Sequence, residues 1–170
     1  VGEALFSGNN FPAKQQDFIF ELKGVIAFYD PPKENIATVL SQFYQAGIKV
    51  KIITGDNAAT TTTIAKKIGL KSADKQISGE ELMLLSEQDL KTKVAETTIF
   101  TRMFPEAKLK IINALKSNNE IVAMTGDGVN DGPALKAAHI GIAMGKKGTE
   151  IAKQAASLIL IDDDLAKMVD

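Results

Sequence analysis

The sequence predicts an α/β protein of three layers, in which helices cover both faces of a mainly parallel sheet. Short apolar runs alternate with helical patterns along the chain, and the loops between them are short. The apolar runs are nearly continuous, as in strands that are buried on both faces. With 170 residues, 45% hydrophobic and 24% charged, the composition suits one globular domain with a substantial core.

Each element of the first half has its own signal. Residues 18–30 are apolar and indicate one long or two short strands after a polar, glycine-rich start. Residues 31–47 open with proline, end in glycine and repeat apolar residues at helical spacing, which predicts a helix. A strand is expected at residues 48–56 and a helix at 57–70, although four threonines in a row lower the helix propensity. A serine followed by acids then predicts one or two short helices within residues 78–97.

The second half continues the alternation. A proline opens the expected helix at residues 105–119, which follows a strand at 98–103. The remaining strands are expected at residues 120–127, 140–144 and 157–163, and the remaining helices at 132–139 and 149–156. No apolar run approaches the roughly 20 residues of a membrane helix. Because the chain starts with Val1 and ends in an amphipathic stretch, we expect both ends to be cuts in a longer chain.

Charge and cysteine content exclude several function classes. The net charge of −1 gives no basic field, so no nucleic-acid partner is expected. The chain has no cysteine, which excludes disulfides and thiolate metal sites. The single histidine has no histidine or cysteine partner that would suggest a metal site.

Polar clusters follow three of the predicted strands. Ligands bind beyond the carboxyl ends of the strands in sheets of this kind, so these clusters are expected to share one site. They comprise Thr54-Gly55-Asp56, the glycine-rich stretch 126–131, and Arg102 with Lys108.

These residue types suit phosphoryl chemistry. A threonine hydroxyl and a glycine N–H can hold phosphate oxygens, and Lys108 can supply a positive charge. Asp127 and Asp131 lie four residues apart across a glycine-rich turn, and such paired carboxylates form a hard oxygen site suited to Mg²⁺. Two like charges 4 Å apart repel by roughly 4 kcal/mol at an effective dielectric near 20, so clustered aspartates call for a cation.

Each signal alone has an ordinary structural interpretation. Thr-Gly-Asp and Gly-Asp-Gly are common turn sequences, and a single lysine on a helix is usually solvated. The acids at residues 162–164 are interpreted as a solvated strand end. Only the ordered combination along one inferred edge of the sheet favours a site.

That combination resembles the phosphorylation domain of P-type ATPases, cation pumps of the haloacid dehalogenase superfamily. The resemblance rests on "TGD" at 54–56, "TRMFPEAK" at 101–108 and "TGDGVNDGPALKAAHIGIAMGKKGTEIAKQAASLILIDDDL" at 125–165, with "YDPPKENI" at 29–36 similar to the family's hinge. It covers residues from about 20 to the end, is nearest the calcium-type pumps, and implies a Rossmann-like, haloacid dehalogenase-like fold. It also implies that residues 1–24 are the tail of a nucleotide-binding domain with the hinge, and that 25–170 are the phosphorylation domain.

The resemblance implies a role for each matching residue. It implies that Asp127 binds Mg²⁺, that Asp131 is its supporting carboxylate, and that Asn130 hydrogen-bonds the phosphoryl group. It implies that Thr54 and Lys108 are catalytic and contact the phosphate. It also implies contacts with phosphate or nucleotide for Gly55, Asp56, Arg102 and Asp30.

One part of the family pattern is missing. The family's nucleophile lies in an Asp-Lys-Thr-Gly-Thr motif at the end of the first sheet strand, and this sequence has none. In the family, that strand lies between the "TGD" and "GDG" strands. We therefore expect residues 24–30 to occupy the empty position, with Asp30 approaching Asp127.

These observations favour a fragment of an ATP-driven cation transporter at the cytoplasmic face of a membrane, with Mg²⁺ as cofactor and ATP as substrate. Its partners would be the missing nucleotide-binding, actuator and transmembrane parts of the same chain, together with the transported cation. The isolated chain is expected to be inactive. The alternatives are a self-standing phosphatase with Asp30 as nucleophile, disfavoured because Pro31 and Pro32 follow it, and a non-enzymatic interaction module.

Overall fold

The structure is a computed structural model that describes residues 1–26 and 31–169. It contains two compact units, Val1–Pro31 and Pro32–Asp170, which are called unit 1 and unit 2. Each unit is described by itself.

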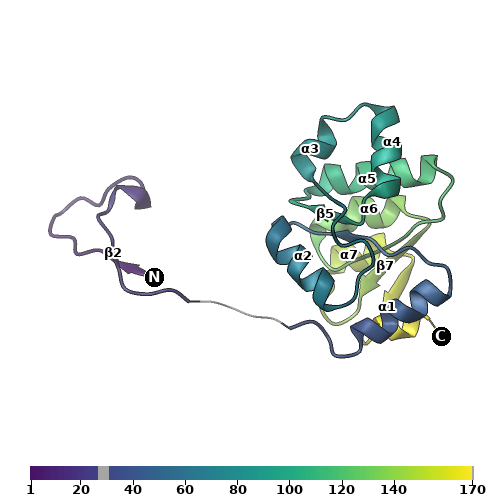
Figure 1. Ribbon diagram of the computed structural model, residues 1–170. Coiled ribbons are helices and arrows are strands. Elements are labelled where there is room, and N and C mark those ends of the chain that lie inside the picture. Colours follow the sequence, from purple (N-terminus) through teal and green to yellow (C-terminus); the bar gives the residue numbers. More distant parts are fainter. Residues whose placement is uncertain (27–30, 170) are drawn as a thin grey trace. The chain divides into compact units, whose positions relative to one another are not determined.

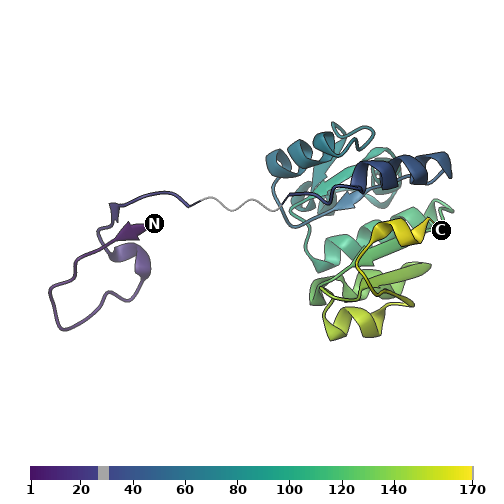
Figure 2. The ribbon, with the colours of Figure 1, turned by 90° about the horizontal axis from the view of Figure 1, so that it is seen from below.

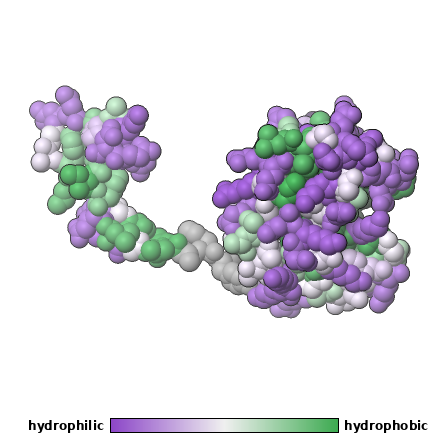
Figure 3. All heavy atoms as spheres, turned by 45° about the horizontal axis from the view of Figure 1, so that its top comes forward, coloured by the Kyte–Doolittle hydropathy of each residue, from purple (hydrophilic) through white to green (hydrophobic). Residues whose placement is uncertain are grey.

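Unit 1 is a small hairpin with an aromatic cluster. Strands β1 (Gly2–Glu3) and β2 (Glu21–Leu22) pair antiparallel, and a short helix η1 (Gln15–Asp17) lies between them. The rings of Phe6 and Phe11 stack with centroids 4.7 Å apart. Much of the apolar surface of this unit remains exposed (Figure 3).

The strands of unit 2 form two parallel sheets of three strands each. One sheet has the order β3-β5-β4 and the other the order β6-β7-β8, and every pairing in them is parallel. The strands are β3 (Ile52–Ile53), β4 (Gln76–Ser78), β5 (Ile99–Thr101), β6 (Ala123–Gly126), β7 (Ile140–Met144) and β8 (Leu158–Leu160). The predicted parallel α/β fold is confirmed, with β4 as a short strand that its sequence did not reveal.

Helices cover both faces of the strands. Neighbouring residues of a strand point to opposite faces, and the first two residues of β5 enter different cores. Phe100 packs in the cluster formed by α3 to α7, whereas Ile99 packs against α1 and α2. Figure 1 shows α3, α4 and α5 on one side of β5, with α1 and α2 on the other, and Figure 2 shows the chain from below with α1 in dark blue. The three-layer arrangement follows from this division.

The helices agree closely with the sequence patterns. Asn57 caps α2 by accepting a hydrogen bond from the Thr60 N–H, and Ser78 with Glu81 forms a capping box at α3. None of the described helices is both long and apolar enough to cross a membrane. Their bounds are α1 Ile36–Gln45, α2 Ala58–Lys67, α3 Gly79–Met83, α4 Glu87–Glu96, α5 Pro105–Ser117, α6 Gly132–Ala137 and α7 Glu150–Ala155, with short helices η2 Val129–Asp131 and η3 Leu165–Met168.

The expected insertion of residues 24–30 between the sheets is wrong for its described part. Residues 24–26 form no strand and belong to unit 1, where the Gly24 N–H donates to the Val1 carbonyl. Residues 27–30, including Asp30, lie outside the described part of the chain. The preceding residues Glu21–Leu22 pair with β1 in the hairpin of unit 1. Consequently β3 and β6 are edge strands, each with one neighbour among the described strands.

The Lys51 side chain caps the carboxyl end of α4. The Lys51 ammonium donates to the carbonyl oxygens of Val94 (2.8 Å), Ala95 (3.1 Å) and Thr97. These groups include the last carbonyls of the helix, which lack partners within it and carry the negative end of its dipole. Burial lowers the pKa of Lys51 to about 8.

Lys51 therefore predicts a pH effect on stability. The folded protein releases the Lys51 proton near pH 8, and the unfolded chain holds it until about the ordinary value of 10.5. Between these values the unfolded state binds more protons, so the Lys51 contribution to stability rises with pH. We expect the difference in unfolding free energy between wild type and Lys51→Met to shift in favour of wild type from pH 8 to pH 10. Urea unfolding at each pH measures it. Lys66→Met, at an exposed lysine, is the control, and a flat difference for Lys51→Met would contradict the prediction.

Candidate functional site

The turn after β3 is fixed by the threonine that the sequence singles out. The Thr54 hydroxyl accepts a hydrogen bond from the Asp56 N–H and donates to the Asp56 carboxylate, both at 3.1 Å. The Thr54 and Asp56 carbonyls accept hydrogen bonds from the N–H groups of Met103 and Arg102, both at 2.9 Å. Hydrogen bonds therefore join the turn after β3 to the turn after β5 at the carboxyl edge of their sheet.

Arg102, in the turn after β5, has an unusual backbone conformation. Its φ of 53° lies in the left-handed region, which residues with a Cβ rarely adopt. Its carbonyl oxygen lies only 2.6 Å from where a Cβ on Gly79 would stand, so glycine at 79 is needed for this approach. The Arg102 side chain itself is exposed. Its predicted nucleotide contact stays a prediction.

Lys108 and Asp131 form an ion pair that is shielded from solvent. The Lys108 ammonium lies 2.7 Å from the Asp131 Oδ1, and the two side chains are only 13% and 10% exposed. The other carboxylate oxygen of Asp131 accepts a hydrogen bond from the Gly128 N–H at 3.2 Å. Lys108 is the fourth residue of α5, a position that brings its positive charge to the turn after β6.

Gly126 makes room for this pair. A Cβ at this position would lie 2.6 Å from the Asp131 Cβ and 2.9 Å from its Cγ, closer than packed atoms can approach. Glycine at 126 thus lets the carboxylate of Asp131 fold back over the end of β6.

Asp127 presents its carboxylate differently. Its side chain is exposed, while its carbonyl accepts a hydrogen bond from the Thr149 N–H at 2.8 Å. Asn130 is exposed on the same turn. The backbone of the turn is fixed, and its polar side chains remain accessible to a ligand.

The donor set fits Mg²⁺ only in part. Among residues 1–26 and 31–169, no group of three or more histidine or acidic side chains could hold a metal ion. The Asp131 carboxylate is engaged by Lys108 and Gly128, so Asp127 is the carboxylate free to bind a cation directly. Mg²⁺ prefers about six oxygen ligands and retains several waters, so one carboxylate needs further oxygens from a phosphate or from another segment.

The structure thus places the predicted residues in two groups. Thr54, Gly55 and Asp56 adjoin Arg102, and Lys108 joins the turn of residues 126–131. Among the described residues, no hydrogen bond or ion pair links the two groups directly. The strands that precede Thr54 and Asp127, β3 and β6, each have one neighbour among the described strands.

Two features were missed by the sequence reasoning. Asp163 is buried, so the interpretation of residues 162–164 as a solvated strand end is wrong at this position. Its carboxylate accepts two backbone N–H groups of the loop 145–149, which explains why burial is tolerated. The second feature is Thr149, which contacts the Asp127 carbonyl. A glycine-rich "GKKGT" segment after a strand was the available signal for this loop.

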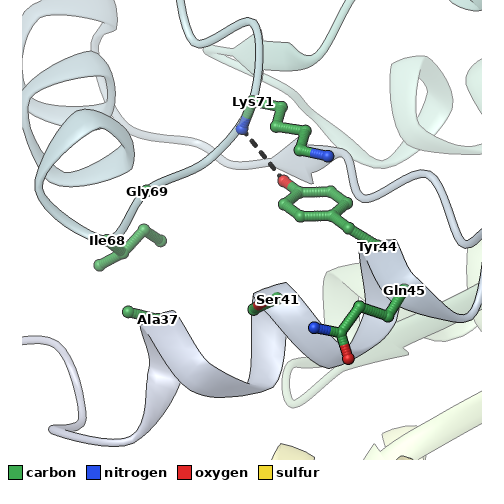
Figure 4. A pocket seen from close by; sticks show the side chains of 7 residues that line it. All are labelled: Ala37, Ser41, Tyr44, Gln45, Ile68, Gly69 and Lys71. Carbon is green, nitrogen blue, oxygen red and sulfur yellow. Dashed lines mark hydrogen bonds between the residues drawn. The ribbon is translucent and has the colours of Figure 1, made fainter.

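A separate hollow lies away from these residues. It has a volume of about 350 Å³ between α1 and the segment after α2 (Figure 4). The Tyr44 hydroxyl accepts a hydrogen bond from the Lys71 N–H at 3.1 Å, and the Lys71 ammonium lies 4.4 Å from the ring centroid. None of the predicted site residues lines this hollow, which is bordered by Ala37, Ser41, Tyr44, Gln45, Ile68, Gly69 and Lys71.

The ion pair makes a first prediction for this site. Removing one partner leaves the other charge with little access to water, so Lys108→Met and Asp131→Asn should each lower the unfolding free energy by roughly 3 kcal/mol. The double variant should lose less than the sum of the two, with a coupling of about 1–3 kcal/mol. Urea unfolding measures all three, with Lys110→Met on the same helix as the control. Strict additivity would show that the pair contributes no coupling.

The close approach of Asp131 to Gly126 leads to a second prediction for this site. Gly126→Ala should displace Asp131 and lower the unfolding free energy by about 1–3 kcal/mol, because an added Cβ has no free volume. Gly128→Ala is a matched control, since the nearest atom would lie at an ordinary 3.6 Å. Thermal or urea unfolding compares the two variants, and equal stability would refute the packing argument.

Comparisons with known proteins agree with one another on the family of this chain. A model of haloacid dehalogenase-like hydrolases matches residues 6–139. The probable cation-transporting ATPase F of Mycobacterium tuberculosis is 46% identical over 150 residues, which is 85% of this chain and 17% of that protein. The human calcium-transporting ATPase type 2C member 1 is 44% identical over 142 residues, covering 83% of this chain and 16% of that protein. The chain therefore spans about a sixth of the length of the curated relatives it matches.

Solved structures agree with the sequence matches. The catalytic domain of the CPx-ATPase CopB-B aligns with a TM-score of 0.62 and 28% identity, over 81% of this chain and 44% of that one. A zinc-transporting PIB-type ATPase aligns with a TM-score of 0.61 and 32% identity, over 81% of this chain and 18% of that one. The chain therefore belongs to the haloacid dehalogenase-like hydrolase family, and most of its length matches a domain of the P-type cation-transporting ATPases.

Proposed function

We propose that this chain is the phosphorylation domain of an ATP-driven cation pump of the calcium-type group. In the intact protein, a carboxylate oxygen of an aspartate outside these 170 residues attacks the γ-phosphorus of ATP. The bond between that phosphorus and the bridging oxygen breaks, and ADP leaves. The proposal is supported by the shielded Lys108–Asp131 pair beside an accessible Asp127, at the carboxyl end of a parallel strand. In phosphoryl transfer, positioning and charge neutralisation supply most of the catalysis.

Each residue of the site has a task that its geometry suits. Lys108 holds a positive charge where solvent screens it little, and Asp131 fixes the position of that charge. Thr54 and Gly55 offer a hydroxyl and an N–H to phosphate oxygens, and Asn130 offers an exposed amide. Asp127 would hold Mg²⁺, which neutralises charge on the transferring phosphoryl group when it is bound.

The unpaired edges of β3 and β6 support the proposed place of the missing nucleophile. Edge strands leave backbone N–H and C=O groups open to pairing with another chain segment. A strand lying between β3 and β6 would end beside both the Thr54 turn and the Asp127 turn. The nucleotide-binding, actuator and membrane parts of the pump would belong to the same longer protein.

The proposal predicts phosphorylation in trans. We expect a synthetic peptide with an apolar strand that ends in Asp-Lys-Thr-Gly-Thr to be phosphorylated on its aspartate by radiolabelled acetyl phosphate, when Mg²⁺ and the full 170-residue chain are both present. Hydroxylamine should release the label, as it does from acyl phosphates. Asp127→Asn and Lys108→Met should each reduce labelling by roughly 100-fold, the scale of losing one charge-stabilising group.

The controls separate the competing functions. Asp162→Asn removes an exposed acid of the same chain and should leave labelling unchanged. A peptide with asparagine in place of aspartate should remain unlabelled. Steady hydrolysis of an aryl phosphate by the chain alone, lost in Asp30→Asn, would instead establish the self-standing phosphatase. Absence of any label with the intact strand peptide would refute the proposed trans reaction.

A further inference from the structure

Asp163 combines burial with an uncommon backbone conformation. It is 8% exposed, although it lies in a run of three aspartates whose first member, Asp162, is exposed. Its φ of 55° lies in the left-handed region, which disfavours residues with a Cβ. A buried charge in a disfavoured backbone conformation indicates strong local constraints.

Those constraints are hydrogen bonds on both sides of the residue. Its two carboxylate oxygens accept the N–H groups of Lys146 and Lys147, each at 3.0 Å. Its carbonyl accepts the Lys33 ammonium, and its own N–H donates to the Leu160 carbonyl at 3.1 Å. Burial by itself raises the pKa of Asp163, but the Lys146 and Lys147 N–H groups hold that pKa below its ordinary value. Asp163 is therefore a carboxylate at neutral pH.

The loop that Asp163 holds is tightly packed against its surroundings. A Cβ on Gly148 would lie 1.9 Å from the Met144 carbonyl oxygen, and one on Gly145 would lie 2.7 Å from the Ile161 Cα. The Gly145 N–H also donates to the Leu160 carbonyl at 2.9 Å. The loop 145–149 thus has little freedom to change shape independently of its contacts.

The far end of this loop reaches the candidate metal residue. The Thr149 N–H donates to the Asp127 carbonyl at 2.8 Å, and Thr149 also caps α7. A continuous chain of contacts therefore runs from the Asp163 carboxylate through Lys146, Lys147 and Thr149 to Asp127.

We propose that Asp163 is a positioning residue that sets the orientation of Asp127 through the loop 145–149. This proposal rests on the proposed role of Asp127 in binding Mg²⁺. Asp163 acts without touching the ligand, by fixing one end of a compact loop whose other end holds the Asp127 backbone.

The same residue joins the two ends of unit 2. Lys33 precedes α1 and contacts the Asp163 carbonyl, while the Asn35 amide donates to the Asp164 carboxylate at 3.1 Å. The Asp164 carboxylate also accepts the Ala166 N–H at 3.1 Å at the start of η3. A displacement of either end of unit 2 thus acts on the segment that orients Asp127.

Hydrogen exchange in the full 170-residue chain tests this. Asp163→Asn keeps the size of the side chain but removes its charge and one acceptor oxygen. In the absence of ligand, we expect the Thr149 amide to exchange about tenfold faster in this variant, as expected for the loss of one hydrogen bond from local opening. The amide resonances of Asp127 and Gly128 should shift, and Mg²⁺ binding, followed by the same resonances, should weaken several-fold.

Matched variants make the outcome decisive. Asp162→Asn, whose carboxylate only pairs with the Lys146 ammonium at 3.7 Å, should leave Thr149 and Asp127 unchanged. Asp163→Gly accommodates the positive φ, so it should fold and show the same faster exchange as Asp163→Asn. Unchanged exchange of β5 amides would exclude global destabilisation as the cause.

The experiment distinguishes failure of the positioning role of Asp163 from failure of the proposed metal role of Asp127. Faster exchange at Lys146 and Lys147 with no change at Thr149 and Asp127 would overturn the positioning role, because the carboxylate would then serve its own loop only. If the wild-type chain fails to bind Mg²⁺, the metal role of Asp127 fails, yet exchange at Thr149 still decides whether Asp163 positions it.

Discussion

The ion pair between Lys108 and Asp131 is the interaction on which the site depends. Two charges with about a tenth of their side-chain surface exposed lose most of their hydration, and only close contact offsets that loss. The 2.7 Å contact and the hydrogen bond from Gly128 supply this compensation. Because the pair also joins α5 to the turn after β6, the position of the Lys108 charge is set by the core of unit 2.

The fold presents this pair beside an open position. The described strands form two parallel sheets, and β3 and β6, which precede the turns of the candidate site, are edge strands. Both sheets contribute to one apolar cluster, through Phe100 from one and Met124 from the other. The shared core therefore holds together the two sheets that carry the two groups of candidate residues.

The sequence predicted most elements, and the places of several candidate residues at strand ends, because its signals are local. Apolar periodicity and caps located the helices, and polar residues after apolar runs located Thr54 and Asp127 at strand ends. Local sequence patterns could not reveal the ion pair between Lys108 and Asp131, since it joins residues 23 positions apart. Asp163 was misinterpreted because three adjacent aspartates look alike in sequence, and only the loop 145–149 distinguishes the one that is buried. The strand interpretation of residues 24–26 failed because an apolar pattern does not specify which partner a segment pairs with.

The contacts of unit 2 also bear on how a phosphorylation domain could report its state. Charge at Asp127 acts on a turn whose backbone is bonded to Thr149, and the same loop is bonded to Asp163. Asp163 in turn contacts Lys33, at the opposite end of unit 2 in the sequence. A closely packed loop with glycines at 145 and 148 changes position as one body rather than absorbing strain. The turn that carries Asp127, the proposed metal residue, is therefore connected to both ends of unit 2 through a few hydrogen bonds.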